Sequence, residues 1–262
     1  MKSLLLLLCV MCAVGVASAD TLYVAPISEP GGDGQSWNTA YRTLNFAFAE
    51  WEAGDEIWLA HGTYMMPDSG MRVKNGMKIY GGFKGNEVRR ELRDWYRNTT
   101  ILRSEGGRSA LRASNCDSTT RLDGLVLEGA TVSALLISGG EPRIFNCHFR
   151  RNTSSVMGAG IFAANVGRIR IEYCVFENNK AESQGGAVYI VNATTDAKGF
   201  GPFIGQCIFV NNESEDGGAL WLDRCAGTVQ IASSVFHGNK ASNMGGAVGS
   251  LSSYFYITNS TF

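Results

Sequence analysis

The sequence predicts an all-β fold, a right-handed parallel β-helix. In this solenoid each coil has three strands, and a capping helix closes the N-terminal end. Two observations carry the prediction. A unit of F-x-x-N, followed five or six residues later by a glycine-rich step into an aliphatic strand, is repeated along the chain. Short runs such as RIRIEYCVF alternate with the period of two that is typical of strands, and they are rich in β-branched residues.

Residues 1–19 have the pattern of a secretory signal peptide. Lys2 precedes an apolar run, and the small residues Ala17 and Ala19 form an A-x-A cleavage pattern. The run is shorter than the roughly 18 residues that a membrane-spanning helix needs, and no later stretch is long enough. We therefore expect an exported chain without a transmembrane helix, either secreted or at the cell surface in association with an outer membrane.

Charge and cysteine usage exclude two classes of function. The full chain has 23 basic and 24 acidic residues, so without Lys2 the balance is 22 against 24, or about −2. Nucleic-acid-binding domains usually have a basic excess, so we expect no nucleic-acid partner. Five cysteines remain after the leader, none in the C-x-x-C spacing of a zinc site, and we expect free thiols and no metal or cofactor.

Residues 20–105 are predicted to form an N-terminal cap and the first coils. The segment TAYRTLNFAFAEW places four apolar residues on one helical stripe, and this helix would cover the open end of the core. The stripe consists of Tyr41, Leu44, Phe48 and Trp51, with Thr39 or Asn38 as the N-cap. We expect flanking strands in TLYVA, DEIWLAHGTYM and MKIYGGF.

Residues 106–262 are predicted to form the β-helix coils. The repeats begin at Phe149, Phe176, Phe209 and Phe236, and Phe262 starts a further copy. An isoleucine stands five residues before each, at Ile144, Ile171, Ile204, Ile231 and Ile257. A cysteine or serine stands two residues before each, at Cys147, Cys174, Cys207, Ser234 and Ser260. Such columns stack in the core when each repeat is one coil, with neighbouring coils about 4.8 Å apart. We expect further coils beyond Phe262.

The asparagines and glycines of the repeat are interpreted as corner residues. Asparagine tolerates left-handed backbone angles and can hydrogen-bond to the asparagine of the next coil, and glycine allows positive φ. The positions are Asn152, Asn179, Asn212 and Asn239, and the pairs Gly185-Gly186, Gly217-Gly218 and Gly245-Gly246. A phosphate-binding loop would need a following helix with Lys and Ser or Thr, whereas these glycines lead into strands.

The repeats carry a family resemblance. The tandem F-x-x-N and GGA-[VIL] units resemble those of chlamydial polymorphic membrane proteins, and of bacterial right-handed β-helix proteins of the pectin-lyase-like superfamily. The segments YVAP…DGQSWNTAYRTL and IYGGFKGNE…RDW resemble the opening of exported bacterial β-helix proteins. The resemblance implies the fold and, through the lyases and hydrolases of the superfamily, a polysaccharide or host-cell glycan as partner.

Two outward columns are candidates for glycan binding. Arg143 and Arg170 stand six residues before successive phenylalanines, and Arg168 lies near them, which makes a basic patch suited to an acidic glycan. The alternative is a solvated face balanced by Glu141 and Glu172. The second column follows the glycine corner. It holds Phe162, Tyr189 and Trp221, which would stack on sugar rings unless turns cover them.

Two functions follow from this pattern. The first hypothesis is an exported, non-catalytic surface or extracellular β-helix protein that acts in adhesion or glycan binding. The alternative is a polysaccharide lyase or glycoside hydrolase acting on an acidic polysaccharide. Ca²⁺ is a candidate cofactor only for the lyase. We name no catalytic residues, because His61, His148 and His237 are scattered and have no carboxylate partner at motif spacing.

Overall fold

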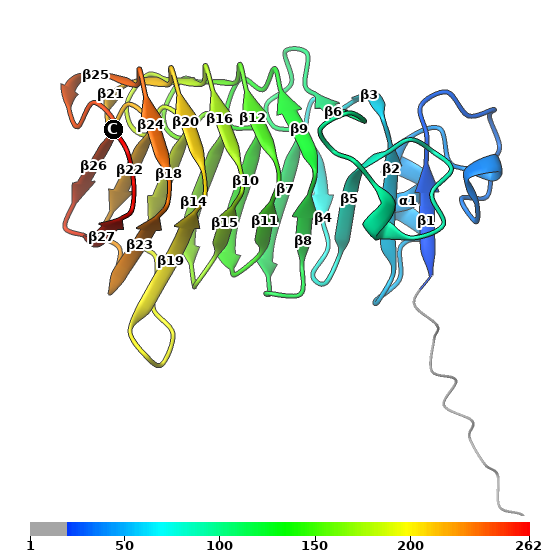
Figure 1. The fold of residues 1–262 in the computed structure, drawn as a ribbon, viewed down its shortest axis with the longest axis horizontal. Coiled ribbons are helices and arrows are strands. Elements are labelled where there is room, and N and C mark those ends of the chain that lie inside the picture. The colour runs from blue at the N-terminus through cyan, green and yellow to red at the C-terminus, as the bar shows by residue number, and fades with distance from the viewer. Residues whose placement is uncertain (1–19) are drawn as a thin grey trace, which may run out of the picture.

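The computed structural model describes residues 20–262, and the predicted signal peptide lies outside the described residues. The chain winds into a stack of coils whose strands lie side by side along one long axis (Figure 1). All pairings between the named strands are parallel, and they build one nine-stranded, two seven-stranded and one four-stranded sheet. The predicted β-helix is confirmed.

We name the four sheets I to IV. Sheet I contains β1 (Thr21–Val24), β2 (Glu56–Ala60), β5 (Lys78–Phe83), β8 (Arg121–Asp123), β11 (Arg143–Phe145), β15 (Arg170–Glu172), β19 (Phe200–Gly205), β23 (Thr228–Ala232) and β27 (Tyr254–Thr258). Sheet II contains β3 (Gly62–Met65), β6 (Thr100–Arg103), β9 (Leu125–Glu128), β12 (His148–Arg150), β16 (Val175–Glu177), β20 (Ile208–Val210) and β24 (Val235–His237).

Sheet III contains β4 (Met71–Val73), β7 (Leu111–Cys116), β10 (Leu135–Gly140), β14 (Ile161–Val166), β18 (Val188–Val191), β22 (Leu220–Asp223) and β26 (Val248–Leu251). Sheet IV is short and contains β13 (Thr153–Ser154), β17 (Lys180–Ala181), β21 (Glu213–Asp216) and β25 (Lys240–Met244). Sheets I to III supply the three strands expected per coil. The repeats add the fourth sheet between sheets II and III.

The core consists of the columns that the repeats predict. Ile144, Ile171 and Ile204 pair in register on sheet I and are fully buried. The phenylalanine rings of sheet II stack face to face from Phe149 to Phe236, and Phe262 continues the stack, with neighbouring centroids 4.7 to 5.0 Å apart. The cysteines are buried free thiols, as expected. Burial of each large apolar side chain contributes about 1.5–3 kcal/mol.

The asparagine column is a continuous hydrogen-bonded ladder. Asn152 donates from Nδ2 to Asn179 Oδ1 at 3.0 Å, and Asn179 donates likewise to Asn212, which donates to Asn239. The expected left-handed backbone lies one residue earlier, at Arg151, Asn178, Asn211 and Gly238. Asn152, Asn179 and Asn212 are therefore buried hydrogen-bonding residues, Asn239 ends the ladder half-buried, and the residue before each one makes the corner.

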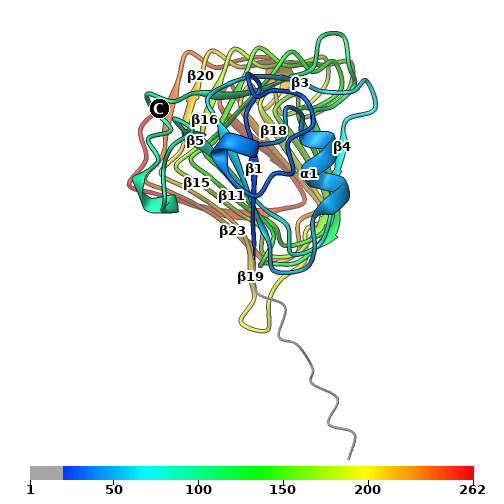
Figure 2. The same cartoon turned by 90° about the vertical axis from the view of Figure 1, so that its right-hand side faces the viewer.

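The capping helix is shorter than predicted. The helix α1 (Leu44–Glu50) begins after Thr43, not after Thr39, and a separate 3₁₀ turn, η1 (Trp37–Thr39), precedes it. The reason is that Tyr41 is extended and bridges to Val24 of β1. Leu44 and Phe48 are still buried in the main core, and α1 lies in front of the coils when the stack is viewed from its N-terminal end (Figure 2).

One corner carries an insertion. In later coils one or two residues connect sheet I to sheet II, for example Gly124 between β8 and β9. Between β5 and β6 the connection is residues 84–99, which include the 3₁₀ turn η2 (Arg90–Leu92). We call this segment the insertion loop. Insertions in solenoid repeats tend to gather on a binding face, which directs attention to this corner and the adjoining sheet I.

Candidate functional site

Three arginines lie side by side on the outer face of sheet I. Arg121 pairs with Arg143, and Arg143 pairs with Arg170, on three successive coils. Each precedes an inward-pointing residue, and because side chains alternate along a strand the arginines point outward. Neighbouring arginines are therefore about 4.8 Å apart at the backbone. We call Arg121, Arg143 and Arg170 the arginine column.

The predicted pair Arg143 and Arg170 is confirmed as one column, and Arg121 was missed. Its coil lacks the F-x-x-N unit, because the phenylalanine position is occupied by Leu127, which pairs with Phe149. Arg121 stands six residues before Leu127, as Arg143 stands six before Phe149. Alignment on a leucine in place of the phenylalanine would have found it.

The column contains one unpaired charge. Arg121 and Arg170 bind the carboxylates two residues later on their own strands, at Asp123 (2.6 Å) and Glu172 (2.6 Å). The strand of Arg143 has Phe145 at that position, and Arg143 is exposed and makes no ion pair within residues 20–262. An exposed guanidinium between two partly neutralised ones is suited to a bound anion.

Aromatic rings lie between the charges. The guanidinium of Arg121 lies 4.1 Å from the ring centroid of Phe145, and that of Arg170 lies 4.8 Å from the ring centroid of Phe203. Stacking on a ring fixes the plane of a guanidinium and leaves its edge free to donate hydrogen bonds. The outer face of sheet I therefore alternates cationic and apolar groups, as a ligand with carboxylates and C–H faces requires.

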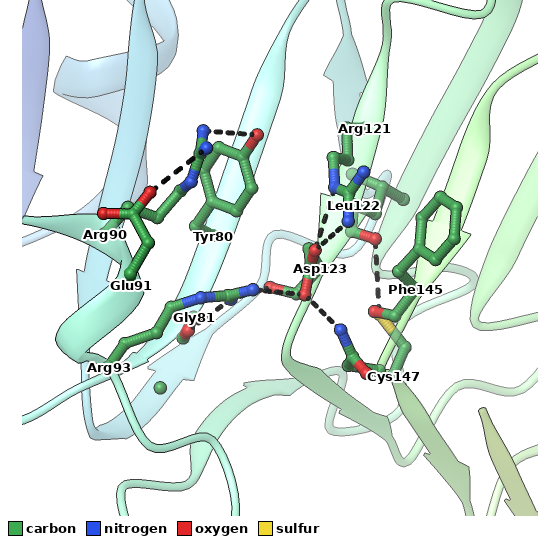
Figure 3. A network of polar contacts seen from close by, with 12 residues as sticks. Tyr80, Gly81, Arg90, Glu91, Arg93, Arg121, Leu122, Asp123, Phe145 and Cys147 are labelled. Atoms are coloured by element: carbon green, nitrogen blue, oxygen red, sulfur yellow. Dashed lines mark hydrogen bonds and ion pairs between the residues drawn. The ribbon is translucent and has the colours of Figure 1, made fainter. Parts of the chain in front are cut away.

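Asp123 anchors the insertion loop to this face (Figure 3). It is buried, and its carboxylate accepts from Arg93 of the loop at 2.6 Å, from Arg121, and from Nδ2 of Asn146 at 2.9 Å. Two cations surround one anion, so the cluster keeps a net positive charge. This charge adds to the attraction that sheet I exerts on anions.

A second cluster extends the face toward the N-terminal end. Arg90 of the insertion loop donates to Glu56 at 2.6 Å and to the hydroxyl of Tyr80 at 3.1 Å, and its guanidinium lies over the Tyr80 ring. Burial, reinforced by the Glu56 carboxylate, raises the pKa of Tyr80. Tyr80 is therefore a neutral hydrogen-bond acceptor at physiological pH, and its contacts position Arg90.

Arg168 lies apart from the arginine column. It precedes β15 and forms an ion pair with Asp196 at 3.3 Å, while its guanidinium lies over the ring of Phe200. Asp196 belongs to the long turn, residues 192–199, that projects from the stack (Figures 1 and 2). Arg168 therefore holds this turn against the coils, and only a third of its side chain is exposed.

Arg150 and Arg151 lie outside the arginine column of sheet I. They bind Glu128, the last residue of β9 in sheet II, at 2.7 Å from Arg150 and 3.1 Å from Arg151. Arg103 binds the same carboxylate. Burial raises the pKa of Glu128, but the hydrogen bonds from the three guanidinium groups outweigh that effect and hold its pKa at about 2. Glu128 is therefore ionised at any physiological pH.

The aromatic column is not an exposed stripe. Tyr189 pairs in register with Phe162 and with Trp221 on the outer face of sheet III, as predicted, but Tyr189 and Trp221 are each only 3% exposed. Glycine turns lie over them, since a side chain at Gly158 would contact Tyr189 and one at Gly217 would contact Trp221. In this conformation Tyr189 and Trp221 cannot stack on a sugar ring.

His148 has a carboxylate partner, which the sequence did not reveal. Its Nε2 lies 3.0 Å from Oε2 of Glu177, the residue paired with Arg150 on the next coil. Burial lowers the pKa of His148, and the Glu177 carboxylate only partly opposes this shift. The repeat alignment contained a signal for this contact. His148 precedes Phe149 and Glu177 follows Phe176, so the two residues lie on paired strands of successive coils.

The remaining acidic residues do not converge. In the dense acidic stretch, Glu213 pairs with Lys180 at 2.7 Å and Asp216 accepts from Asn243 at 2.9 Å. Residues 20–262 contain no group of three or more His, Cys, Asp or Glu side chains placed to hold a metal ion. No helix in this part of the chain is long and apolar enough to cross a membrane.

Comparisons with known proteins concern the fold. A family model described as the right handed beta helix region matches residues 95–262, well over half of the chain. No curated protein matches. A rhamnogalacturonan lyase structure is similar with a TM-score of 0.51 and 14% identity over 93% of this chain. The pectate lyase Pel9A gives a TM-score of 0.46 and 16% identity over 94% of this chain.

The chain spans 63% of the length of the rhamnogalacturonan lyase and 79% of that of the pectate lyase. At these identities the likeness concerns the fold alone. The matched family model and the stacked parallel sheets agree with the β-helix part of the predicted resemblance. The chain belongs to the family of right-handed β-helix proteins.

Proposed function

We propose that this chain binds an acidic polysaccharide along the outer face of sheet I. The observation that carries the proposal is the arginine column, in which Arg121, Arg143 and Arg170 repeat at the strand spacing and Arg143 has no acidic partner in the described part of the chain. A polymer with a carboxylate on successive sugars repeats its charge along one line. A column of cations along the solenoid axis can meet several of those charges at once.

The proposal includes export and surface location. The N-terminal sequence has the signal-peptide pattern, and the repeats resemble those of polymorphic membrane proteins, which are displayed on a cell surface. A non-catalytic chain with these properties would act in adhesion or in holding a glycan at the surface. Expression with residues 1–19 fused to a reporter, followed by fractionation, tests export independently of binding.

Removal of the Arg143 side chain is the direct test of binding. Arg143→Ala should weaken binding of oligogalacturonate about tenfold at low ionic strength, and the effect should shrink as salt screens the charges. Titration calorimetry at two salt concentrations measures both effects. Arg112→Ala is the matched control, because Arg112 is an exposed arginine on sheet III. Equal affinities for the two variants would refute the proposed surface.

A polysaccharide lyase is the second candidate function. The similarity to a rhamnogalacturonan lyase over 93% of this chain favours it at the level of fold. Incubation with polygalacturonate, alginate and chondroitin, with and without Ca²⁺, and measurement of the ultraviolet absorbance of unsaturated products decides between lyase and binding protein. Calcium-dependent turnover would replace the non-catalytic proposal. Reducing-end release without that absorbance would instead indicate a hydrolase.

A further inference from the structure

A small groove lies at the corner where sheet I turns into sheet II. It has a volume of about 180 Å³ and is lined by Trp95 and Tyr96 of the insertion loop and by Tyr173. Trp95 is 36% exposed, Tyr96 87% and Tyr173 52%. Trp95 lies against Gly124, and Tyr173 occupies the same corner two coils later. Two coils span about 10 Å, which leaves room for one flat ring between aromatic side chains.

The insertion-loop wall of the groove is held in place. Arg93 donates to Gly81 O at 2.9 Å and to Asp123, and its guanidinium lies 5.0 Å from the Trp95 ring. The carboxylate of Glu87 accepts from three backbone N–H groups at the start of the loop. A wall fixed before binding loses little conformational entropy when a ligand arrives.

Tyr173 has a backbone conformation that is unusual for a tyrosine. Its φ is 56°, a left-handed conformation that bulky side chains rarely adopt. The same corner position holds Gly124, Asn146, Gln206 and Ser233 in other coils, all of them smaller or more tolerant of this conformation. Gln206 donates to the Tyr173 hydroxyl at 3.2 Å and restrains the ring. A strained aromatic residue that remains half exposed suggests a role in binding.

Polar groups line the floor of the groove. Arg150 donates from Nε to Glu128, while its terminal Nη groups make no hydrogen bond within residues 20–262. The side-chain amide of Asn146 donates to Asp123, and its oxygen, Oδ1, accepts no hydrogen bond from residues 20–262. The groove therefore combines aromatic rings, a guanidinium with free donors and an amide acceptor. These groups match the C–H face, the carboxylate and the hydroxyls of a uronic-acid ring.

We propose that this corner groove binds one uronic-acid ring of the polysaccharide that sheet I binds. The inference rests on the proposed function, because it adds a second contact for the same polymer. Asn146 is three residues from Arg143, or about 10 Å along the strand, a distance that a short oligosaccharide spans. The ring stacks on Tyr173 and on Tyr96 or Trp95, and its carboxylate accepts from Arg150.

The test compares binding by variants that remove a ring without disturbing the backbone. In Tyr173→Asn the new side chain is the one that Asn146 already places at this corner. Tyr96→Ser removes the most exposed ring of the groove. Each should weaken binding of short oligogalacturonates about threefold to tenfold. Phe46→Ser, which removes an aromatic ring that is 59% exposed on α1, outside both sheet I and the groove, should leave affinity unchanged.

Ligand chemistry provides the second part of the test. Titration calorimetry is run with oligogalacturonate, oligoalginate and chondroitin oligosaccharides, and with oligogalacturonate whose carboxyl groups have been reduced to alcohols. The reduced ligand should bind more weakly, and Tyr173→Asn should weaken what remains. If Arg143→Ala weakens binding while Tyr173→Asn and Tyr96→Ser bind like the wild type, the groove is refuted and the proposed function stands. If the wild type binds none of the acidic ligands, both are refuted.

Discussion

At the scale of single residues, Glu128 is a buried carboxylate whose pKa is strongly lowered by three arginines. It is 5% exposed and accepts hydrogen bonds from Arg103, Arg150 and Arg151 at 2.6 to 3.1 Å. Burial alone favours the neutral acid, but the three guanidinium groups reverse that preference and lower the pKa from 4.5 to about 2. Ionised Glu128 therefore stabilises the folded state and orients Arg150 beside the corner groove.

The stability contribution of Glu128 should depend on pH. A carboxylate whose pKa is lowered on folding contributes fully above its ordinary pKa of 4.5 and loses the contribution as pH falls toward about 2. Glu128→Gln should lower the free energy of unfolding by about 2 kcal/mol at pH 7, and the difference from the wild type should shrink below pH 4.5. Urea unfolding at several pH values measures this.

Glu105→Gln is the control for this prediction, because the Glu105 side chain is 69% exposed and lies 4.0 Å from Arg103. It should change stability little at either end of the pH range. A pH-independent loss for Glu128→Gln would mean that lost packing, and not the ionised state, determines the cost.

At the scale of elements, two glycines allow the insertion loop to lie on the coils. Gly124 has φ +73°, and a Cβ there would lie 2.8 Å from Arg93 Nη1 and 3.2 Å from Trp95 Cβ. Gly82 has φ +93°, and a Cβ there would lie 2.6 Å from Trp95 Cα. The loop can approach this closely because neither position carries a side chain.

Gly124→Ala should therefore displace the insertion loop. We expect a loss of about 2–4 kcal/mol in the free energy of unfolding, from left-handed backbone strain and from steric contact with Arg93 and Trp95. Trypsin should cleave within residues 84–99 faster than in the wild type, and mass spectrometry of the fragments identifies the site.

Gly106→Ala is a matched control, because Gly106 has φ +70° and no atom within 4 Å of an added Cβ. It should incur only the backbone strain, about 1–2 kcal/mol, without new cleavage in the loop. Equal losses and equal cleavage patterns for the two variants would show that the loop does not depend on Gly124.

The repeat pattern predicted the regular elements and missed the irregular ones. Columns such as Ile144 to Ile204 could be read from the sequence because each coil repeats the same inward positions. The path of residues 84–99 occurs once, so no column indicates where Arg93 and Trp95 lie. Alternation placed Tyr189 on the outer face, but its burial depends on a turn from a neighbouring coil, which strand periodicity does not describe.

At the scale of the whole molecule, each coil pairs only with the coil before and the coil after it. Sheet I runs in chain order from β1 to β27, and the same holds for the strand order of the other sheets. Stability is then close to a sum over coils and the interfaces between neighbours. The arginine column and the corner groove depend on this stacking, because both are built from residues of successive coils. A break in one internal coil should separate the coils on either side of it.

Ile204→Asp places such a break in the coil of β19, which has β15 before it and β23 and β27 after it in sheet I. Ile204 is fully buried between Ile171 and Ile231 of sheet I, where a carboxylate has no partner and cannot be hydrated. We expect the variant to be insoluble or to lack cooperative unfolding, measured by circular dichroism and size-exclusion chromatography. Ile204→Val, which removes one methylene group, should fold and lose about 0.5–1.5 kcal/mol. Gln230→Asp, which places the same charge on the outer face of the next strand, should also fold. A cooperatively folded Ile204→Asp would mean that the isoleucine column does not face the core.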